Sequence, residues 1–233
     1  MEVIERSSPN SGPRRGDALP DMVVIHHTAM AGADAALDRL CDPASEVSAH
    51  YLIAADGRVW SLVPETERAW HAGAGRWGDV SDVNSRSIGI ELDNPGPLAG
   101  FPPFSEPQMA ALEELLDGIL ARWSIPPARI IAHSDMAPGR KADPGPKFDW
   151  RRLALGGRAV WVEAVAADPA MFHTAAERAG YRAPEGEPGA VLDAFRLRFR
   201  PQGSGAGPDA TDAGLMAALA EAWPCVDGGG VPT

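Results

Sequence analysis

Positive charge, cysteine and long apolar runs are all scarce in this sequence. Its 233 residues include 21 Lys and Arg against 32 Asp and Glu, which gives a formal net charge of -11 at pH 7. Nucleic acids and anionic membrane surfaces attract proteins through an excess of Lys and Arg. The acidic balance therefore argues against both kinds of partner, and we expect neither nucleic-acid binding nor membrane binding.

Cysteine is limited to Cys41 and Cys225, which lie far apart in the chain. Two such distant residues indicate neither a disulfide framework nor a thiolate metal site. No apolar stretch approaches the roughly 18 residues that a membrane-spanning helix needs. The first 20 residues contain no apolar run of about seven residues or more, as a secretory signal or a lipoprotein leader has, so we expect a cytoplasmic protein.

Short alternating or β-branched segments predict five strands in the first part of the chain. The second and third are joined by ADGR, which is typical of a hairpin because Asp-Gly tolerates positive φ. The expected strands span residues 21–27, 48–54, 58–63, 87–92 and 129–133.

Helical spacing of apolar residues is strongest over residues 105–123, where Ser105 and Gln108 form a capping box at the start. A weaker helix is predicted at about 33–40. Strands mixed with helices, with one hairpin and one longer crossover, predict an α/β fold: a mixed central sheet flanked by helices.

After residue 155 the pattern changes to three short amphipathic segments, PAMFHTAAERAGY, PGAVLDAFRLRFR and DAGLMAALAEAW. They predict a small three-helix C-terminal domain. We therefore expect, along the chain, an N-terminal extension (1–20), an α/β domain (21–155), a linker (156–168), the three-helix domain (169–224) and a flexible tail (225–233).

The loop AHSDMAPGRKADPGP (132–146) places His133, Lys141 and Asp143 in a stretch where prolines and glycines prevent a continuous helix. His26 and His133 end predicted strands, where α/β sheets present ligands. Two imidazoles and one carboxylate form a zinc ligand set that leaves a fourth position for water. By spacing alone, a single histidine at a strand end is more often a hydrogen-bonded structural group.

Two charged residues complete a possible hydrolytic site. Glu91 ends the predicted strand 87–92 and is placed to carry a proton. Lys141 is one of only two lysines in the chain, and two residues before Asp143 it is placed to face a developing negative oxygen. These residue types together indicate a metal-dependent hydrolase.

Five segments in order, VVIHHT, VSAHYLI, LVPETERAWHAG, NSRSIGIELDN and AHSDMAPGRKADPGPKFDW, closely resemble the zinc-dependent N-acetylmuramoyl-L-alanine amidases. This family also includes phage amidase lysozymes and peptidoglycan recognition proteins. The resemblance covers about residues 20–155 and is most specific in the last segment. The aspartate at 143, where some relatives have cysteine, matches the bacterial branch.

The resemblance implies one catalytic zinc bound by His26, His133 and Asp143, with Glu91 as the catalytic glutamate and Lys141 as the lysine that stabilises the transition state. His27 should face away from the metal, because alternate strand residues point to opposite faces.

Three further residues are candidates for substrate binding. Trp70 and His71 match a segment that lines the substrate cleft in the family, although a core tryptophan with a hydrogen-bonded histidine explains the pattern as well. His50 occurs beside the cleft in relatives, with a buried structural role equally open.

The C-terminal helices resemble the peptidoglycan-binding modules that accompany some of these amidases, and a packing role that stabilises the main domain is the alternative. The resemblance implies hydrolysis of the amide bond between N-acetylmuramic acid and L-alanine. From the acidic charge and the expected cytoplasmic location, we predict (anhydro-)muropeptides from peptidoglycan recycling as substrates. The alternatives are a non-catalytic muropeptide-binding or sensing module and an exported cell-wall autolysin.

Overall fold

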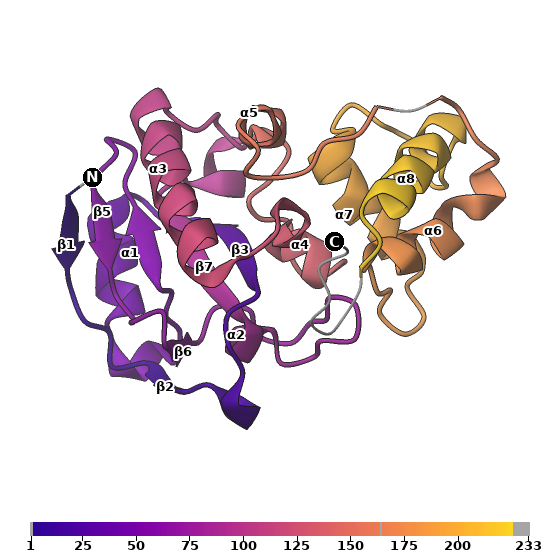
Figure 1. Cartoon of the computed structure of the whole chain (residues 1–233). Coiled ribbons are helices and arrows are strands. Elements are labelled where there is room, and N and C mark those ends of the chain that lie inside the picture. Colours follow the sequence, from indigo (N-terminus) through magenta and orange to yellow (C-terminus); the bar gives the residue numbers. More distant parts are fainter. Residues whose placement is uncertain (1, 164, 226–233) are drawn as a thin grey trace.

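A computed structural model describes residues 2–163 and 165–225, and its centre is a six-stranded mixed sheet (Figure 1). Neighbouring strands are parallel except for the antiparallel hairpin of β4 and β5, in which Gly57 turns with φ of 90°. Across the sheet the order is β1 (Val3–Glu5), β5 (Val59–Ser61), β4 (Tyr51–Ile53), β7 (Ser87–Leu92), β3 (Met22–His27) and β8 (Ile130–Ala132).

The five predicted strands and the mixed α/β class are confirmed. The N-terminal residues that were expected to form an extension contribute two strands of their own. β1 pairs with β5 at the sheet edge, and β2 (Ser11–Pro13) pairs with β6 (Glu67–Ala69) in a small antiparallel sheet. These three-residue strands are too short for a periodic pattern to reveal. The predicted flexible tail lies outside the described residues apart from Cys225.

Helix α3 (Glu106–Trp123) covers one face of the sheet (Figure 1). Ser105 caps it by accepting a hydrogen bond from the Gln108 backbone N–H, which is one half of the predicted capping box. The other half is not formed, because the Gln108 side chain instead donates to the carbonyl oxygens of Ile53 and Asp93. Its fully buried Leu112, Leu116 and Ile119 pack against Val23 and Ile25 of β3. Each such side chain contributes about 2 kcal/mol through removal from water.

The other face of the sheet is covered in two parts. Near β4 and β5, helix α1 (Ala33–Leu40) packs Leu37 against Leu52 and Trp60. Near β3 and β8, the alternate residues Met22 and Val24 pack against the C-terminal helices. The metal candidates lie on this second face, because His26 continues the alternation that begins at Met22.

The three predicted C-terminal helices are present as α6 (Phe172–Ala179), α7 (Gly189–Phe199) and α8 (Ala210–Ala222). They share one continuous apolar core with the sheet, which includes Ile131 of β8, Phe172 and Phe195. Val160 and Val162 of the predicted linker are buried in the same core. The C-terminal helices therefore pack against the α/β domain.

Three short helices were not predicted: α2 (Val83–Arg86), α4 (His133–Met136) and α5 (Trp150–Leu155). Four to six residues give too few turns for an apolar period to be recognised. Helix α4 lies between the sheet and α7 (Figure 1). None of the helices in the described part of the chain combines the length and the hydropathy required to cross a membrane.

Candidate active site

Three adjacent parallel strands end with the candidate residues. His26 of β3 stands opposite Glu91 of β7 in the sheet register, and Ile25 stands opposite Ala132 of β8, the residue before His133. Because parallel strands bring their carboxyl ends to one edge of the sheet, these side chains converge as the sequence predicted. The loop after α4 then returns Asp143 to the same edge.

The three predicted metal ligands form one compact, buried group. His26 Nδ1 lies 2.9 Å from His133 Nδ1 and 3.1 Å from Asp143 Oδ2, and His133 Nδ1 lies 2.9 Å from the same carboxylate oxygen. Side-chain exposure is 10% or less for all three. In the described part of the chain, this is the one group of three or more His, Cys, Asp or Glu side chains able to hold a metal ion.

The outer nitrogen of His133 fixes the position of its proton. His133 Nε2 lies 3.0 Å from the carbonyl oxygen of Ala72, and a carbonyl oxygen only accepts hydrogen bonds. Nε2 therefore carries the proton in the neutral ring. The Nδ1 lone pair is left facing Asp143 and His26.

A relay of hydrogen bonds fixes the proton of His26 in the same way. The Ser87 hydroxyl donates to the Val83 carbonyl oxygen at 2.6 Å, so it accepts from His71 Nε2 at 3.2 Å. His71 Nδ1 is then an acceptor, and His26 Nε2–H donates a hydrogen bond to it at 3.0 Å. Burial, together with the charge of neighbouring His133, lowers the pKa of His26 to about 4, which favours the neutral ring.

The site therefore presents two unprotonated ring nitrogens and a carboxylate oxygen to one another, within about hydrogen-bond distance and with no proton between them. Such lone pairs repel unless a cation lies among them. Two imidazoles and one carboxylate are a donor set that divalent zinc accepts in catalytic sites, where a fourth position stays open. The residues present fit this metal.

Glu91 reaches the same site from β7. Its Oε2 atom is buried and has no hydrogen-bond partner among the described residues. Burial, with a smaller contribution from the charge of Asp143, raises the pKa of Glu91 to about 8. In the metal-free protein this carboxyl group therefore favours its protonated form at neutral pH.

The 132–146 loop is held by its own backbone. The Ser134 N–H donates to the Asp143 carbonyl oxygen at 3.0 Å, and the Lys141 N–H donates to the Ala137 carbonyl oxygen at 3.0 Å. Arg140 ties the loop to the neighbouring segment by donating to the Ala72 carbonyl oxygen at 2.8 Å. The exposed Lys141 side chain is left to line the cleft beside the metal ligands.

A cleft of about 290 Å³ opens over the site. All five predicted catalytic and metal-binding residues line it, and so do Trp70 and His71 of the predicted substrate-binding set. Its far end is formed by α1 and the segments next to it, with Met30, Arg39, Leu40, Val47 and Ser48. The cleft therefore combines apolar walls with positive charge at Lys141 and Arg39.

His50, the third substrate-binding candidate, lies behind the cleft. It is fully buried, its Nδ1 accepts from the Gly89 N–H at 2.9 Å, and its Nε2 lies 3.1 Å from the Glu67 carbonyl oxygen. Both ring nitrogens are thus occupied within the protein, and the ring does not line the cleft. This is the buried structural position that the sequence left open.

His27 faces away from the ligand group, as predicted for the neighbour of His26. Its Nδ1 lies 3.1 Å from the Pro144 carbonyl oxygen, and its ring packs against Phe101 at 6.0 Å between centroids. The residue also lines the cleft, next to His26.

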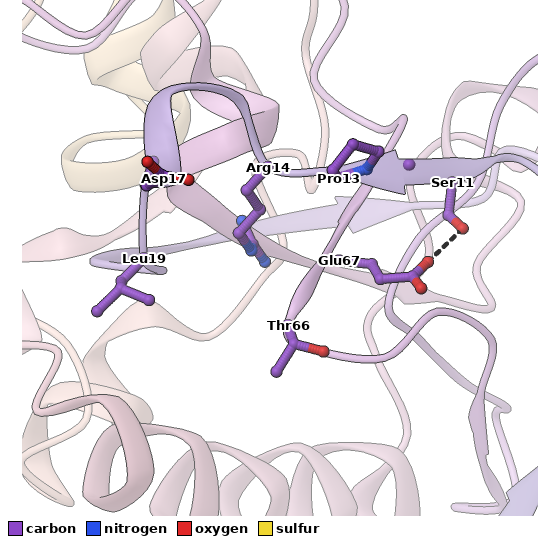
Figure 2. A pocket seen from close by; sticks show the side chains of 9 residues that line it. Ser11, Pro13, Arg14, Asp17, Leu19, Thr66 and Glu67 are labelled. Atoms are coloured by element: carbon purple, nitrogen blue, oxygen red, sulfur yellow. Dashed lines mark hydrogen bonds between the residues drawn. The ribbon is translucent and has the colours of Figure 1, made fainter.

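A wider, open hollow of about 710 Å³ lies on the small β2–β6 sheet (Figure 2). Ser11 donates to the Glu67 carboxylate at 2.6 Å across it. Arg14 is buried here and donates to the carbonyl oxygens of Glu65, Ser85 and Ser87. This arginine anchors the N-terminal residues to the start of β7, and its cationic head is therefore occupied within the protein.

Sequence reasoning missed the residues that support the ligands. Ser87 completes the relay behind His26. Asn84 Oδ1 accepts from the backbone N–H groups of His71 and Ala72 at 3.0 and 2.8 Å, which positions the hydrogen-bond partners of both candidate ligand histidines. The nearest signal was NSRSIGIEL itself, whose polar residues precede a buried strand.

Comparison with known proteins identifies relatives over most of the chain. Residues 16–146 match the family model described as N-acetylmuramoyl-L-alanine amidase. N-acetylmuramoyl-L-alanine amidase AmiD of Escherichia coli is 38% identical over 229 residues, which cover 86% of this chain and 82% of that protein. The 1,6-anhydro-N-acetylmuramyl-L-alanine amidase AmpD of the same organism is 32% identical and covers 64% of this chain and 88% of its own.

Solved structures agree with these matches. The E. coli AmiD complex with anhydro-N-acetylmuramic acid-L-Ala-D-gamma-Glu-L-Lys superposes with a TM-score of 0.80 at 35% identity, covering 94% of this chain and 93% of its own. AmpDh3 of Pseudomonas aeruginosa superposes with a TM-score of 0.81 at 31% identity, covering 94% and 96%. On the matching family model and on the extent of its likeness to AmiD, this chain belongs to the N-acetylmuramoyl-L-alanine amidase family.

Proposed function

We propose that this enzyme hydrolyses the amide bond between 1,6-anhydro-N-acetylmuramic acid and L-alanine in muropeptides, with one zinc ion held by His26, His133 and Asp143. One observation carries the proposal. The inner nitrogens of both histidines and the carboxylate of Asp143 face one another, while the outer nitrogen protons are fixed by Ala72 and His71. This arrangement is the one that a cation stabilises.

Zinc bound to two imidazoles and a carboxylate supplies Lewis acidity: it polarises a carbonyl oxygen and lowers the pKa of water toward 7. The protein contributes two histidine rings that are oriented by hydrogen bonds to Ala72 and His71 without the metal. The hydrogen bonds behind each histidine raise its basicity and hold its ring plane.

Glu91 is the proposed proton carrier. Its unpartnered carboxylate oxygen lies in the cleft beside the ligands. Burial raises its pKa to about 8 in the metal-free protein, and the positive charge of a bound zinc ion would lower that pKa again and favour the carboxylate form that accepts a proton. In the proposed reaction Glu91 takes a proton from the attacking water. It then gives that proton to the nitrogen of L-alanine, so that the amine leaves without negative charge.

Lys141 is the proposed oxyanion stabiliser. Its side chain lines the cleft next to Asp143, and the ammonium group is a compact positive charge. As water attacks, the carbonyl oxygen of the lactyl group gains negative charge. A fixed cation at that oxygen stabilises the transition state more than the neutral substrate.

The substrate class follows from the relatives. The AmiD structure holds an anhydro-N-acetylmuramic acid tripeptide, an AmpDh3 structure holds anhydromuramic pentapeptide, and AmpD is named for the 1,6-anhydro substrate. We propose the same class here, with Trp70 at the cleft wall contacting sugar or peptide. A role in peptidoglycan recycling is consistent with this substrate.

Two further proposals concern the location of the protein and the role of its C-terminal helices. The cytoplasmic location rests on the expectation drawn from the N-terminal residues, with an exported autolysin as its alternative. Peptidoglycan binding by the C-terminal helices rests on their sequence resemblance, and their shared core with the sheet supports the packing role.

The deciding experiment follows a purified anhydro-muropeptide by mass spectrometry with four samples: wild type, chelator-treated wild type, the same sample with zinc restored, and Glu91→Gln. We expect release of free stem peptide by wild type, its loss on chelation and its return with zinc. Glu91→Gln should bind zinc and cleave at least 100-fold more slowly. Intact substrate in every sample, with zinc bound, would support the non-catalytic binding module instead.

A further inference from the structure

The helix that begins at the proposed metal ligand His133 contains a fully buried carboxylate. Asp135 is 0% exposed and sits in α4, two residues after His133. Its Oδ2 accepts from the backbone N–H of Ala132 at 2.9 Å. This bond caps the first turn of α4, the helix that begins at His133, so Asp135 holds the backbone from which the His133 side chain projects.

The C-terminal helices hold both oxygens of this carboxylate. The Tyr181 hydroxyl, just after α6, donates to Asp135 Oδ1 at 2.8 Å. Arg198 of α7 donates from Nη1 to Asp135 Oδ2 at 2.8 Å. Both partners are 4% exposed or less. The hydrogen bonds span 46 and 63 residues of sequence, so they join the C-terminal helices to α4, the helix that begins at His133.

The buried guanidinium group of Arg198 forms one ion pair, with Asp135. Its Nε and Nη2 atoms have no hydrogen-bond partner within the described residues. Its guanidinium group lies 4.0 Å from the ring centroid of Trp150 and 4.9 Å from that of Phe199, which offer their faces to the charge. A buried cation that forms a single ion pair is a poor source of stability, because removal from water offsets the attraction. Orientation of Asp135 is the function that explains it.

The surrounding packing leaves Tyr181 little freedom to move. Its ring packs edge-on against Trp77 at 5.1 Å between centroids and also contacts Phe195. The same core includes Met136 and Ala137, which follow Asp135 in the chain. These apolar contacts hold the Tyr181 ring where its hydroxyl can donate to Asp135.

We infer that Tyr181 and Arg198 are positioning residues for the metal ligand His133 and act on it through Asp135. This inference rests on the proposed function, since it takes His133 as a zinc ligand. The C-terminal helices then form part of the support of the catalytic site, whether or not they also bind peptidoglycan.

The test uses the full chain with Tyr181→Phe, which removes one hydroxyl oxygen and keeps the ring in the core. Zinc affinity is measured by competition with a chromophoric chelator, and ligand geometry by the visible spectrum of the cobalt-substituted protein. We expect zinc affinity to fall about 5-fold to 10-fold, toward the range found when partners of metal ligands are removed. The cobalt bands should shift, and kcat should fall with KM unchanged.

Arg182→Gln is the matched control. Arg182 pairs with Asp79 at 3.6 Å, so it also joins the C-terminal segment to the α/β domain but has no contact with Asp135. This variant should keep the zinc affinity and the cobalt spectrum of wild type. A second pair covers the case in which Tyr181→Phe folds poorly: Arg198→Lys retains a donor for Asp135 and should bind zinc at least 5-fold more tightly than Arg198→Met.

The outcomes separate the two claims. If wild type binds zinc and Tyr181→Phe matches it in affinity and cobalt spectrum, the inference is overturned and the proposed function stands. Equal affinities for Arg198→Lys and Arg198→Met would also overturn it. If wild type itself binds no zinc, the proposed function is lost and the inference with it.

Discussion

Gly89 and His71 occupy adjoining space in which only a glycine leaves room for the ring. A Cβ atom at Gly89 would lie 2.4 Å from Cγ of His71. The imidazole thus packs directly on the backbone of β7, between His26 and Ser87. Its Nδ1 is hydrogen-bonded to His26 and its Nε2 to Ser87. Glycine at this buried strand position therefore leaves room for the ring that accepts a hydrogen bond from the candidate metal ligand His26.

Gly89→Ala is expected to destabilise the protein by about 1 to 3 kcal/mol, the usual cost of overpacking a filled core. Urea unfolding of the metal-free protein measures the change. Gly12→Ala is the control, because a Cβ there meets no atom within 4 Å. The steric cause also predicts coupling: in a His71→Ala background, Gly89→Ala should cost much less. Equal costs in both backgrounds would contradict it.

His71→Phe is expected to lower zinc affinity by about 10-fold to 100-fold. The substitution keeps a ring of similar size but removes the acceptor of the His26 Nε2 proton, so the orientation of His26 Nδ1 is no longer fixed. Isothermal titration of metal-free protein with zinc provides the measurement. The exposed His173 gives the control, since His173→Phe should leave the affinity within twofold. A similar result for His71→Phe would remove its assigned role.

Acid should destabilise the metal-free protein through its buried histidines. Burial, together with the charge of Arg14, lowers the pKa of His50 from 6.5 to about 3. Between these pH values the unfolded chain binds a proton that the folded chain does not, so the free energy of unfolding falls as pH falls. One such group contributes a slope of at most about 1.4 kcal/mol per pH unit. Burial lowers the pKa of His26 and His71 too, which adds to the same trend.

His50→Asn tests this assignment, because the amide oxygen of Asn retains an acceptor for the Gly89 N–H and does not titrate. Urea unfolding at pH 7.5 and pH 5 should give a smaller difference for this variant than for wild type. His173→Asn, at an exposed position, should leave the difference unchanged. A wild-type slope in His50→Asn would contradict the assignment, because it would show that His50 binds protons equally in the folded and unfolded chains.

Lys141→Met is expected to lower kcat for anhydro-muropeptide cleavage by about 100-fold to 1,000-fold with KM changed less than threefold, as for loss of one oxyanion donor. Zinc affinity should stay near that of wild type, because Lys141 is not a ligand in the proposed site. Lys147→Met is the control: the chain's other lysine donates to the Gly100 carbonyl oxygen at 3.4 Å and does not line the cleft. A rise in KM alone would assign Lys141 to substrate binding.

The sequence by itself determined the α/β class, the main strands and helices, and the candidate ligand set. Strand periods, the Ser105 cap and the Asp-Gly turn act over a few residues, so they are readable without a structure. Strand-end positions made His26, Glu91 and His133 candidates, and the resemblance of five segments to the amidase family implied their roles. Only the tertiary structure decided which side chains support them, because Tyr181 and Arg198 reach Asp135 across 46 and 63 residues. No local pattern records such a contact: it exists because the C-terminal helices and the sheet bury their apolar faces in one core.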